Sequence, residues 1–353
     1  MASAGWMTAP SLRAAATDGD PGAFRRTLLR LMAALRDGHG WVEGGAPRTS
    51  FPVALCVLDG RVWVKASLGG PPRGSELLVV DGEPAQARLA RLASQLPSAT
   101  AGSLAHAQAW AFLGEGEGPA VRLRFRAPDG SVGNQEVARR PPSQALAALG
   151  RPKPVEELRP GIWYVDLDRV EAADLAGAMP RLAEAKGVVF DVRGYPNVAP
   201  DTFLSHLSDK PLTSARWNVP VILEPDRQGW TWDSRGRWNL RPRKPRIRGR
   251  VVFLVGGGAI SYAESCLGIV EAYRLADLVG EPTAGTNGNV NPFRLPGGYQ
   301  VSWTGMQVLK HDGTPHHGVG IHPTVPISPT PRGLAAGRDE VLAKGLDVAE
   351  AGR

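Results

Sequence analysis

The sequence predicts a mixed α/β protein whose second half alternates buried strands with helices. Val251–Val255 is a continuous apolar run with the length and β-branched content of a strand buried on both faces. Gly161–Leu167 and Gly187–Arg193 are two further apolar strands, separated by a helical pattern from about Glu171 to Ala185. A strand–helix–strand order with apolar interiors predicts parallel pairing of the two strands through a right-handed crossover.

Length and composition limit the classes of protein that need to be considered. The 353 residues are enough for two or three domains. Cys56 and Cys266 are too few for a disulfide framework and lie in apolar strings, so we interpret them as buried thiols. No apolar stretch approaches the length of a membrane span, and the first twenty residues show no signal peptide.

The formal net charge is +7, and much of the excess lies in the basic run Arg241–Arg250. Such a run can mark a nucleic-acid contact. This one contains prolines and leads directly into the buried strand, so we favour a solvated connector and expect no nucleic-acid partner.

A candidate nucleophile follows the strand Val251–Val255. Three glycines come first, then Ser261, and then a helical pattern of apolar residues. A serine at a helix N-terminus lies where backbone N–H groups converge and stabilise negative charge, which suits a nucleophile with an oxyanion hole. The alternative is that Ser261 only caps the helix, as most serines in this position do.

The stretch from Arg250 to Gly285 resembles the serine-bearing segment of the tail-specific, or C-terminal-processing, serine peptidases. Ser261 with Glu264, and the turn Gly280–Gly285, fill the places of the family's motifs. The resemblance implies that Ser261 is the nucleophile and that the backbone N–H of Tyr262 is one oxyanion donor. It also implies a crotonase/ClpP-like strand–helix catalytic domain.

A candidate base comes from the N-terminal region, where a helical pattern over Phe24–Leu35 precedes Asp37 and His39. By itself His39 can be a plain loop residue. Leu35, Asp37 and His39 match a Leu-x-Asp-x-His motif found in the family and in its tricorn-core and interphotoreceptor-retinoid-binding-protein-like relatives. That resemblance implies that His39 is the general base for Ser261. The lysine of another branch falls on Thr286, so a lysine dyad is not expected.

The chain departs from the family pattern at the supporting positions. The family's serine falls on Gly38 and its late glutamate falls near His317, so we expect either Asp37 to orient His39 or His317 to change the electrostatics of the site. At the turn Asp191–Asn197, Pro196 has no N–H to donate to an oxyanion. Gly194 is our candidate for the second donor, with Asn197 as the alternative, and we interpret Asp191 and Arg193 as a structural ion pair.

We divide the chain into an N-terminal helical region (1–45), a PDZ-like β-rich module (46–142) and a catalytic domain (143–353). Arg73–Pro84 resembles a PDZ segment, and a helix near 85–96 and a hairpin over 121–137 complete the module. A PDZ domain binds peptides by strand addition, but this module can also serve only as a shield. We interpret 142–160 as a linker.

Three further segments leave alternatives open. Residues 201–238 look loop-like, and their tryptophans either line a cleft or cover the core. Two strands, 299–303 and 306–309, are expected to form a hairpin. A cluster of histidines near the C-terminus could in principle bind a metal ion, but their spacing does not match that of known metal ligands, so we disfavour a metal site. These histidines are His311, His316, His317 and His322.

The sequence therefore predicts a serine hydrolase that acts by acyl transfer on a peptide or an ester, first of all a serine peptidase. It needs no cofactor and no metal. The alternatives are a weakened or inactive relative that binds a peptide or an apolar ligand, and a promiscuous esterase. The presence of both Ser261 and His39 favours the enzyme.

Overall fold

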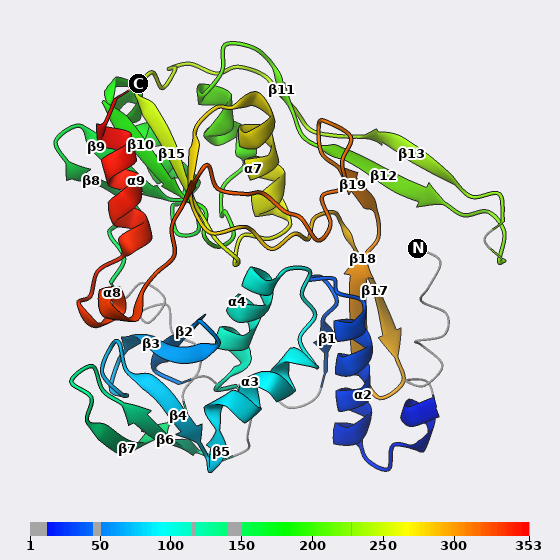
Figure 1. Ribbon diagram of the computed structural model, residues 1–353. Helices are drawn as coiled ribbons and strands as arrows, with labels where there is room; N and C mark the ends of the chain where they lie inside the picture. Colours follow the sequence, from blue (N-terminus) through cyan, green and yellow to red (C-terminus); the bar gives the residue numbers. More distant parts are fainter. Residues whose placement is uncertain (1–12, 45–50, 115–117, 140–149, 227, 353) are drawn as a thin grey trace. The chain divides into compact units, whose positions relative to one another are not determined.

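The computed structural model describes residues 13–44, 51–114, 118–139, 150–226 and 228–352, and the expected lack of a signal peptide concerns residues mostly outside these ranges. The chain divides into two compact units (Figure 1). The first comprises Met1–Gly150, Val290–Thr304 and Thr330–Gly337; the second comprises Arg151–Asn289, Gly305–Pro329 and Arg338–Arg353. The three-part division made from the sequence stays a prediction.

The second unit is built on a six-stranded sheet in the order β20-β16-β15-β10-β9-β8. All neighbouring strands are parallel except β8, which runs antiparallel to β9. The predicted parallel pairing across helix α6 (Ala172–Glu184) is confirmed. The strands are β8 (Val155–Arg159), β9 (Ile162–Asp166), β10 (Gly187–Asp191), β15 (Arg250–Val255), β16 (Asp277–Gly280) and β20 (Val325–Pro326).

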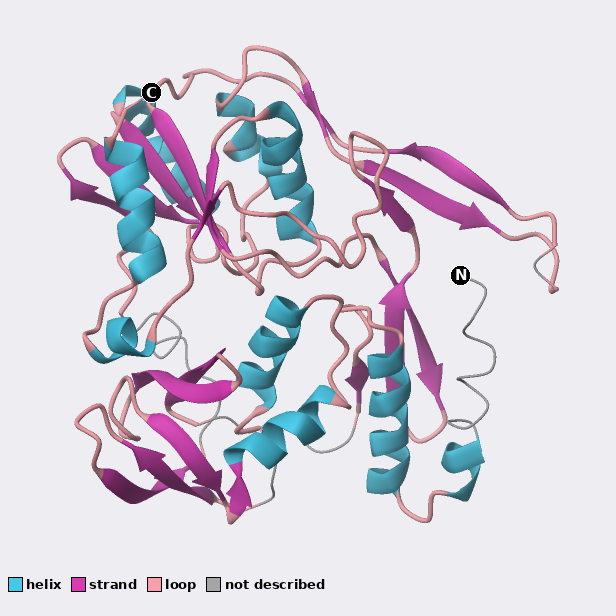
Figure 2. Cartoon of the chain, viewed as in Figure 1, coloured by secondary structure: helices cyan, strands magenta, loops and turns pink. Residues whose placement is uncertain are grey.

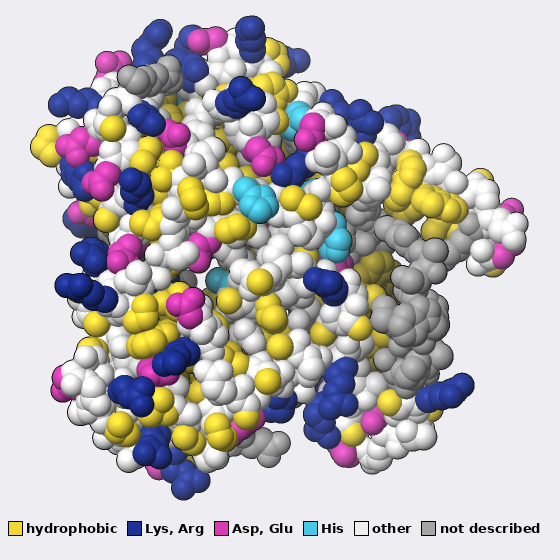
Figure 3. Space-filling view, in the orientation of Figure 1, with side chains coloured by type: hydrophobic (Ala, Val, Ile, Leu, Met, Phe, Trp, Pro, Cys, Tyr) yellow, Lys and Arg dark blue, Asp and Glu magenta, His cyan; other side chains and the backbone are white. Residues whose placement is uncertain are grey.

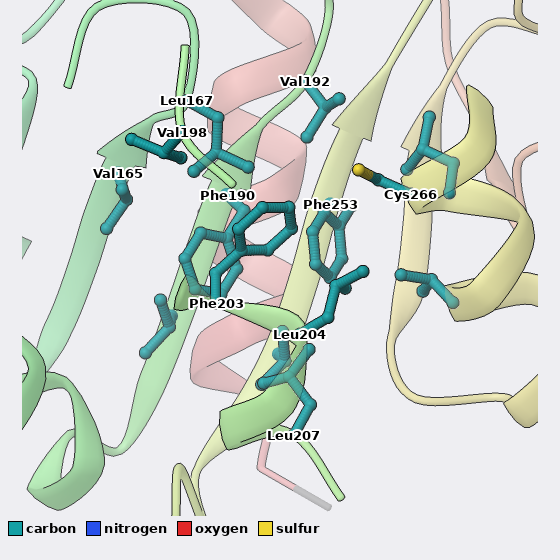
Figure 4. Packing of buried hydrophobic residues seen from close by; sticks show 14 of the residues in the cluster. Val165, Leu167, Phe190, Val192, Val198, Phe203, Leu204, Leu207, Phe253 and Cys266 are labelled. Atoms are coloured by element: carbon teal, nitrogen blue, oxygen red, sulfur yellow. The ribbon is translucent and has the colours of Figure 1, made fainter. Parts of the chain in front are cut away.

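Both faces of this sheet are covered, as the continuous apolar strands predict. On one face Phe190 and Phe253 stack with ring centroids 5.1 Å apart and pack with Phe203 against helices α6 and α7 (Tyr262–Tyr273) (Figure 4). On the other face Val252 and Leu254 pack against helix α9 (Glu340–Glu350). Strand β15 is therefore firmly held where it leads into the glycine turn before Ser261.

Two predictions about connecting segments are wrong. The described part of the supposed linker forms strand β8, because its backbone pairs with β9 at the sheet edge; residues 140–149 lie outside the described ranges. The supposed loop 201–238 contains turns η1 (Pro200–Thr202) and η2 (Leu204–His206), and strands β11 (Leu212–Thr213), β12 (Arg216–Val221) and β13 (Thr231–Gly236), followed by β14 (Asn239–Leu240).

Of the two roles expected for the tryptophans of this segment, covering the core is seen at Trp238, and lining a cleft stays a prediction. Trp238 packs against the core and against the ring of Tyr262, 5.4 Å between centroids. Trp230 is 46% exposed on the hairpin of β12 and β13. Strand β12 also pairs with β19 (Gln307–Leu309).

The first unit contains helix α2 (Pro21–Ala34), whose N-cap Asp20 accepts a hydrogen bond from the Ala23 N–H at 2.8 Å. The helix packs on a three-stranded sheet of β1 (Val42–Glu43), β18 (Tyr299–Thr304) and β17 (Val290–Leu295). The predicted hairpin of 299–303 with 306–309 is wrong, because β18 pairs with β17 and β1 while β19 pairs with β12.

The same unit holds a second sheet in the order β2-β3-β4-β6-β7 (Figure 2). The predicted helix and hairpin are confirmed as α3 and the pair β6–β7; helix α4 was not predicted. The elements are β2 (Val53–Leu58), β3 (Arg61–Ser67), β4 (Glu76–Val80), β5 (Glu83–Pro84), α3 (Ala85–Ala93), α4 (Ala101–Ala111), β6 (Ala120–Arg126), β7 (Val132–Ala138) and α8 (Pro331–Ala335).

The basic run 241–250 lies against acidic side chains. Arg243 pairs with Asp201, Lys244 pairs with Asp209 at 3.1 Å, and Arg250 pairs with Asp277 at 2.9 Å. On the face of the molecule seen in Figure 3, lysine and arginine side chains are interspersed with aspartate and glutamate. None of the described helices combines the length and the apolarity that a membrane crossing requires.

Candidate active site

Ser261 occupies the N-cap position of α7 in a rare backbone conformation, with φ 59° and ψ −110°. A positive φ is uncommon for a residue with a Cβ and points to a position fixed by its surroundings. The Ser261 hydroxyl makes no capping hydrogen bond with the helix. The simple N-cap interpretation therefore accounts for the position of Ser261 along the helix but not for its side chain.

Glu264, one turn into α7, organises the loop that holds Ser261. Its carboxylate is fully buried and accepts hydrogen bonds from the N–H groups of Gly285 at 2.8 Å and Thr286 at 2.9 Å. The Thr283 hydroxyl also donates to this carboxylate. The Thr286 carbonyl then accepts the Ser261 N–H at 2.8 Å. The backbone of Ser261 is thus fixed through Thr286 to a buried charge.

Gly320 and His316 close the other side of this carboxylate. Gly320 has φ 69°, and a Cβ there would lie 2.7 Å from Thr283 Oγ1 and 3.0 Å from Glu264 Oε1, so only glycine fits. The His316 ring, 2% exposed, brings Nε2 to 3.1 Å from Glu264 Oε1. His316 Nε2 forms no hydrogen bond with this carboxylate, so the two groups are only within ion-pair distance. His317, the residue named from the sequence, is exposed.

Two backbone amides have the properties of oxyanion donors. In the part of the chain that the structure describes, neither the Tyr262 N–H nor the Gly194 N–H has a hydrogen-bond acceptor. The Asn197 N–H is bound to the Leu167 carbonyl at 2.7 Å, which removes that alternative. Tyr262 also lies at the positive end of the α7 dipole.

A buried charge network lies beneath the turn that carries Gly194. Arg193 pairs with Asp191 at 2.6 Å and with Asp339 at 2.8 Å, which confirms the predicted structural ion pair. Burial acts to raise the pKa of Asp191, but the charge of Arg193 and its hydrogen bonds hold that pKa below its usual range. The network ties the end of β10 to the start of α9.

Asp168 packs directly against Gly194. A Cβ on Gly194 would meet the Asp168 carboxylate at 2.2 Å from Oδ2, so any side chain would displace one of them. Burial, and after it the negative charge of Asp191, raises the pKa of Asp168 to about 7, although Arg151 opposes the shift. One oxygen of this carboxylate, Oδ1, is buried without a hydrogen bond.

The pH dependence of stability should reveal Asp168. Because the folded pKa of Asp168, about 7, exceeds the ordinary value of 3.8, the folded state holds the proton to higher pH, and the free energy of unfolding falls as pH rises from about 4 to 7. We expect Asp168→Asn to raise the free energy of unfolding at pH 8 by roughly 2–4 kcal/mol, and by much less at pH 4. Urea unfolding at both pH values measures this; an equal change at the two contradicts it.

His39 belongs to the first unit and is 8% exposed. Its Nδ1 lies 2.9 Å from Thr304 Oγ1, and that hydroxyl donates to Asp37 Oδ1 at 2.8 Å. Since the single hydroxyl proton goes to Asp37, Nδ1 must carry a proton and donate it. In the neutral imidazole the remaining lone pair is then on Nε2, the form that a general base requires.

Backbone contacts hold the same arrangement in place. The Thr304 N–H donates to Asp37 Oδ2 at 2.6 Å, and the His39 N–H donates to Asp37 Oδ1 at 3.1 Å. The Ser302 hydroxyl donates to the His39 carbonyl at 2.5 Å. Asp37 is therefore linked to the His39 ring through Thr304, and a supporting part for Gly38 stays a prediction.

The sequence could not identify Thr304, because it lies 265 residues beyond His39 in a strand with no motif of its own. His316 was recognised only as one of a histidine cluster.

The described residues contain no group of three or more His, Cys, Asp or Glu side chains suited to a metal ion. Instead, His316 contacts Glu264, and His311 Nε2 lies 2.8 Å from the Thr213 carbonyl oxygen.

Comparison with known proteins defines the class. Residues 161–327, which include every strand of the sheet except β8, Ser261 and the loop on Glu264, match Peptidase family S41. This part of the chain thus matches a family of serine peptidases, as the resemblance of its serine segment indicated. A comparison with curated protein sequences gave no match.

Among solved structures, the chain is similar to mature CPAF complexed with lactacystin, with a TM-score of 0.75, 16% identity, and coverage of 97% of this chain and 90% of that one. A second structure of mature CPAF gives a TM-score of 0.74 at 17% identity, covering 97% and 89%. The photosystem II D1 C-terminal processing protease gives 0.48 at 18% identity, covering 92% and 88%. At these identities the CPAF structures show the shared mixed α/β fold.

Proposed function

We propose that this chain hydrolyses peptide bonds with Ser261 as nucleophile and His39 as general base. His39 Nε2 takes the hydroxyl proton while Ser261 Oγ attacks the carbonyl carbon, and the same proton passes to the leaving amine. Water then releases the acyl group from Ser261. The observation that carries the proposal concerns Ser261 at the N-terminus of α7. Its backbone is held at positive φ, and its hydroxyl makes no capping hydrogen bond with the helix.

The state of His39 supports its role as the base. The contacts to Thr304 and Asp37 give the tautomer with the lone pair on Nε2, and burial limits the orientations of the ring. These contacts support Asp37 for the supporting role that the sequence left open, with Thr304 as the intermediary. Removing an orienting group lowers a rate by orders of magnitude without abolishing chemistry.

The N–H groups of Tyr262 and Gly194 are our two oxyanion donors. Both lack an acceptor in the described structure, so both are free to donate to a bound oxyanion. Donors fixed before the reaction stabilise the developing negative charge at no cost in reorganisation. His317 has no part in this scheme, because its neighbour His316 makes the contact with Glu264.

We place the chain in the histidine-dependent, tricorn-core-like branch. The support is that Thr286, at the lysine position, is fully buried and is engaged through its backbone in holding Ser261. We also propose that the second unit is crotonase/ClpP-like and that the sheet of β2 to β7 with α3 and α4 is PDZ-like. The order of strands and helices in each unit is what supports these assignments.

A fluorophosphonate probe tests the nucleophile directly, because it phosphonylates an activated serine hydroxyl. We expect the wild-type protein to gain one adduct, located on Ser261 by peptide mass spectrometry, and Ser261→Ala to gain none. Ser265→Ala is the matched control, since Ser265 lies one turn along α7 and its hydroxyl is bound to Asn287 at 2.9 Å. Absence of labelling in wild type, or unchanged labelling in Ser261→Ala, would contradict the mechanism. Parallel assays with casein and with a p-nitrophenyl ester distinguish peptidase from esterase.

A further inference from the structure

A cationic cavity of about 180 Å³ lies in the second unit, away from the serine turn. Its walls come from the start of β12, from the connection between β13 and β14, and from the turn after β19. Arg216, Arg237, Lys310 and His311 contribute to the lining, and no acidic residue does. Four residues whose side chains can be positive therefore line one small space, and the two arginines are exposed to solvent.

The backbone around the cavity is tightly fixed. Ser214 bonds to Trp238 twice: its N–H donates to the Trp238 carbonyl at 3.2 Å, and its hydroxyl accepts the Trp238 N–H at 2.9 Å. On the other side His311 Nε2 lies 2.8 Å from the Thr213 carbonyl oxygen. Arg216 pairs across the sheet with Leu309 of β19. These bonds position the two arginines without engaging their side chains.

The two arginine side chains have no partner of their own. In the described part of the chain, the side chains of Arg216 and Arg237 form no ion pair, hydrogen bond or ring contact. Lys310 is paired with Glu271 at 3.0 Å. The nearby Asp312 does not line the cavity, and its carboxylate accepts hydrogen bonds from the N–H and hydroxyl of Thr314. The local positive charge is thus left uncompensated.

The cavity lies at the opposite end of α7 from Ser261. The His311 ring packs on Tyr273, the last residue of the helix, with centroids 5.5 Å apart. A helix of this length separates its ends by about 18 Å at 1.5 Å per residue. An extended peptide spans about the same distance with five or six residues.

We propose that this cavity binds an anionic group, a carboxylate or a phosphate, on a peptide substrate at several residues from the bond that is cleaved. Guanidinium groups bind both oxyanions through paired, charge-assisted hydrogen bonds, and two unpaired ones in a shared cavity suit such a group. That the anion belongs to a substrate rests on the proposed peptidase function; that the cavity binds the anion does not.

Binding is measured with Ser261→Ala protein, so that no peptide is cleaved and the result is independent of catalysis. The probes are inorganic phosphate and three otherwise identical acetylated, amidated glycine-rich hexapeptides that carry glutamate, phosphoserine or glutamine at one position. Calorimetric titration gives each Kd. We expect the glutamate or the phosphoserine peptide to bind at least about tenfold more tightly than the glutamine peptide, and the tighter of the two identifies the anion.

A double variant, R216Q/R237Q, should weaken binding of the anionic peptides by about tenfold or more. The matched control is Arg235→Gln, two residues from Arg237 on the same hairpin, because Arg235 is paired with Asp233 at 2.7 Å and does not line the cavity. It should change Kd less than about twofold. Equal binding of all three peptides, retention of binding in the double variant, or binding of inorganic phosphate alone would each overturn the proposal. Circular dichroism verifies that the variants are folded.

Discussion

Replacing His39 by glutamine is expected to slow the phosphonylation of Ser261 by at least about 10³-fold. Glutamine has a similar length and can still bond to Thr304, but it has no lone pair able to take the serine proton. A serine hydroxyl without a base is a weak nucleophile. The measured quantity is the second-order rate constant for reaction with the fluorophosphonate probe, which needs no knowledge of the natural substrate.

Two further variants separate the base from its support. Thr304→Val removes the hydroxyl between His39 and Asp37 while keeping the shape of the side chain, so we expect a smaller loss than for His39→Gln. Thr304→Ser restores the hydroxyl and should recover most of the rate. His322→Gln, at an exposed histidine, is the control and should react as wild type does. A His39→Gln protein that reacts within threefold of wild type would exclude His39 as the base.

Glu264→Gln is expected to have the largest effect on stability, lowering the free energy of unfolding by about 3–5 kcal/mol. Both carboxylate oxygens accept hydrogen bonds: from the Gly285 N–H and the Thr283 hydroxyl at Oε1, and from the Thr286 N–H at Oε2. In either orientation the glutamine amide group turns a donor towards another donor. One buried N–H or hydroxyl is therefore left unsatisfied, and the loop that fixes Ser261 loses its anchor.

Urea unfolding measures the change in stability, and the labelling rate of Ser261 measures the loss of its fixed geometry. Glu281→Gln is the control in the same segment of chain, since Glu281 is only half-buried and receives none of these bonds. If Glu264→Gln unfolds at the wild-type urea concentration and is labelled at the wild-type rate, the loop does not depend on this carboxylate.

The strands and the serine turn could be predicted because their signals are local. The apolar run at Val251–Val255 can be satisfied only by burial on both faces, and the parallel pairing of β9 with β10 follows from the helix between them. The ion pair of Asp191 and Arg193 could also be predicted, because two residues so close in sequence at a strand end are neighbours in any fold.

The remaining features depend on contacts between distant parts of the chain. Strand β18 pairs with β1 about 260 residues away, which brings Thr304 to His39, and no pattern near Thr304 marks that contact. His316 and His317 are adjacent in sequence but differ completely in exposure, since one is 2% exposed beside Glu264 and the other faces solvent. A shift of one residue in a turn reverses the direction of a side chain, so composition alone could not choose between them.

The distance from Ser261 Oγ to His39 Nε2, measured in a crystal structure of the protein at neutral pH, is the most direct test of the proposed chemistry. We expect the two atoms to lie within hydrogen-bond reach, about 2.6–3.2 Å, or to be joined by one bridging water. A crystal structure in which the imidazole stays bound to Thr304 while Nε2 faces away from the serine, with and without a phosphonate on Ser261, would contradict it.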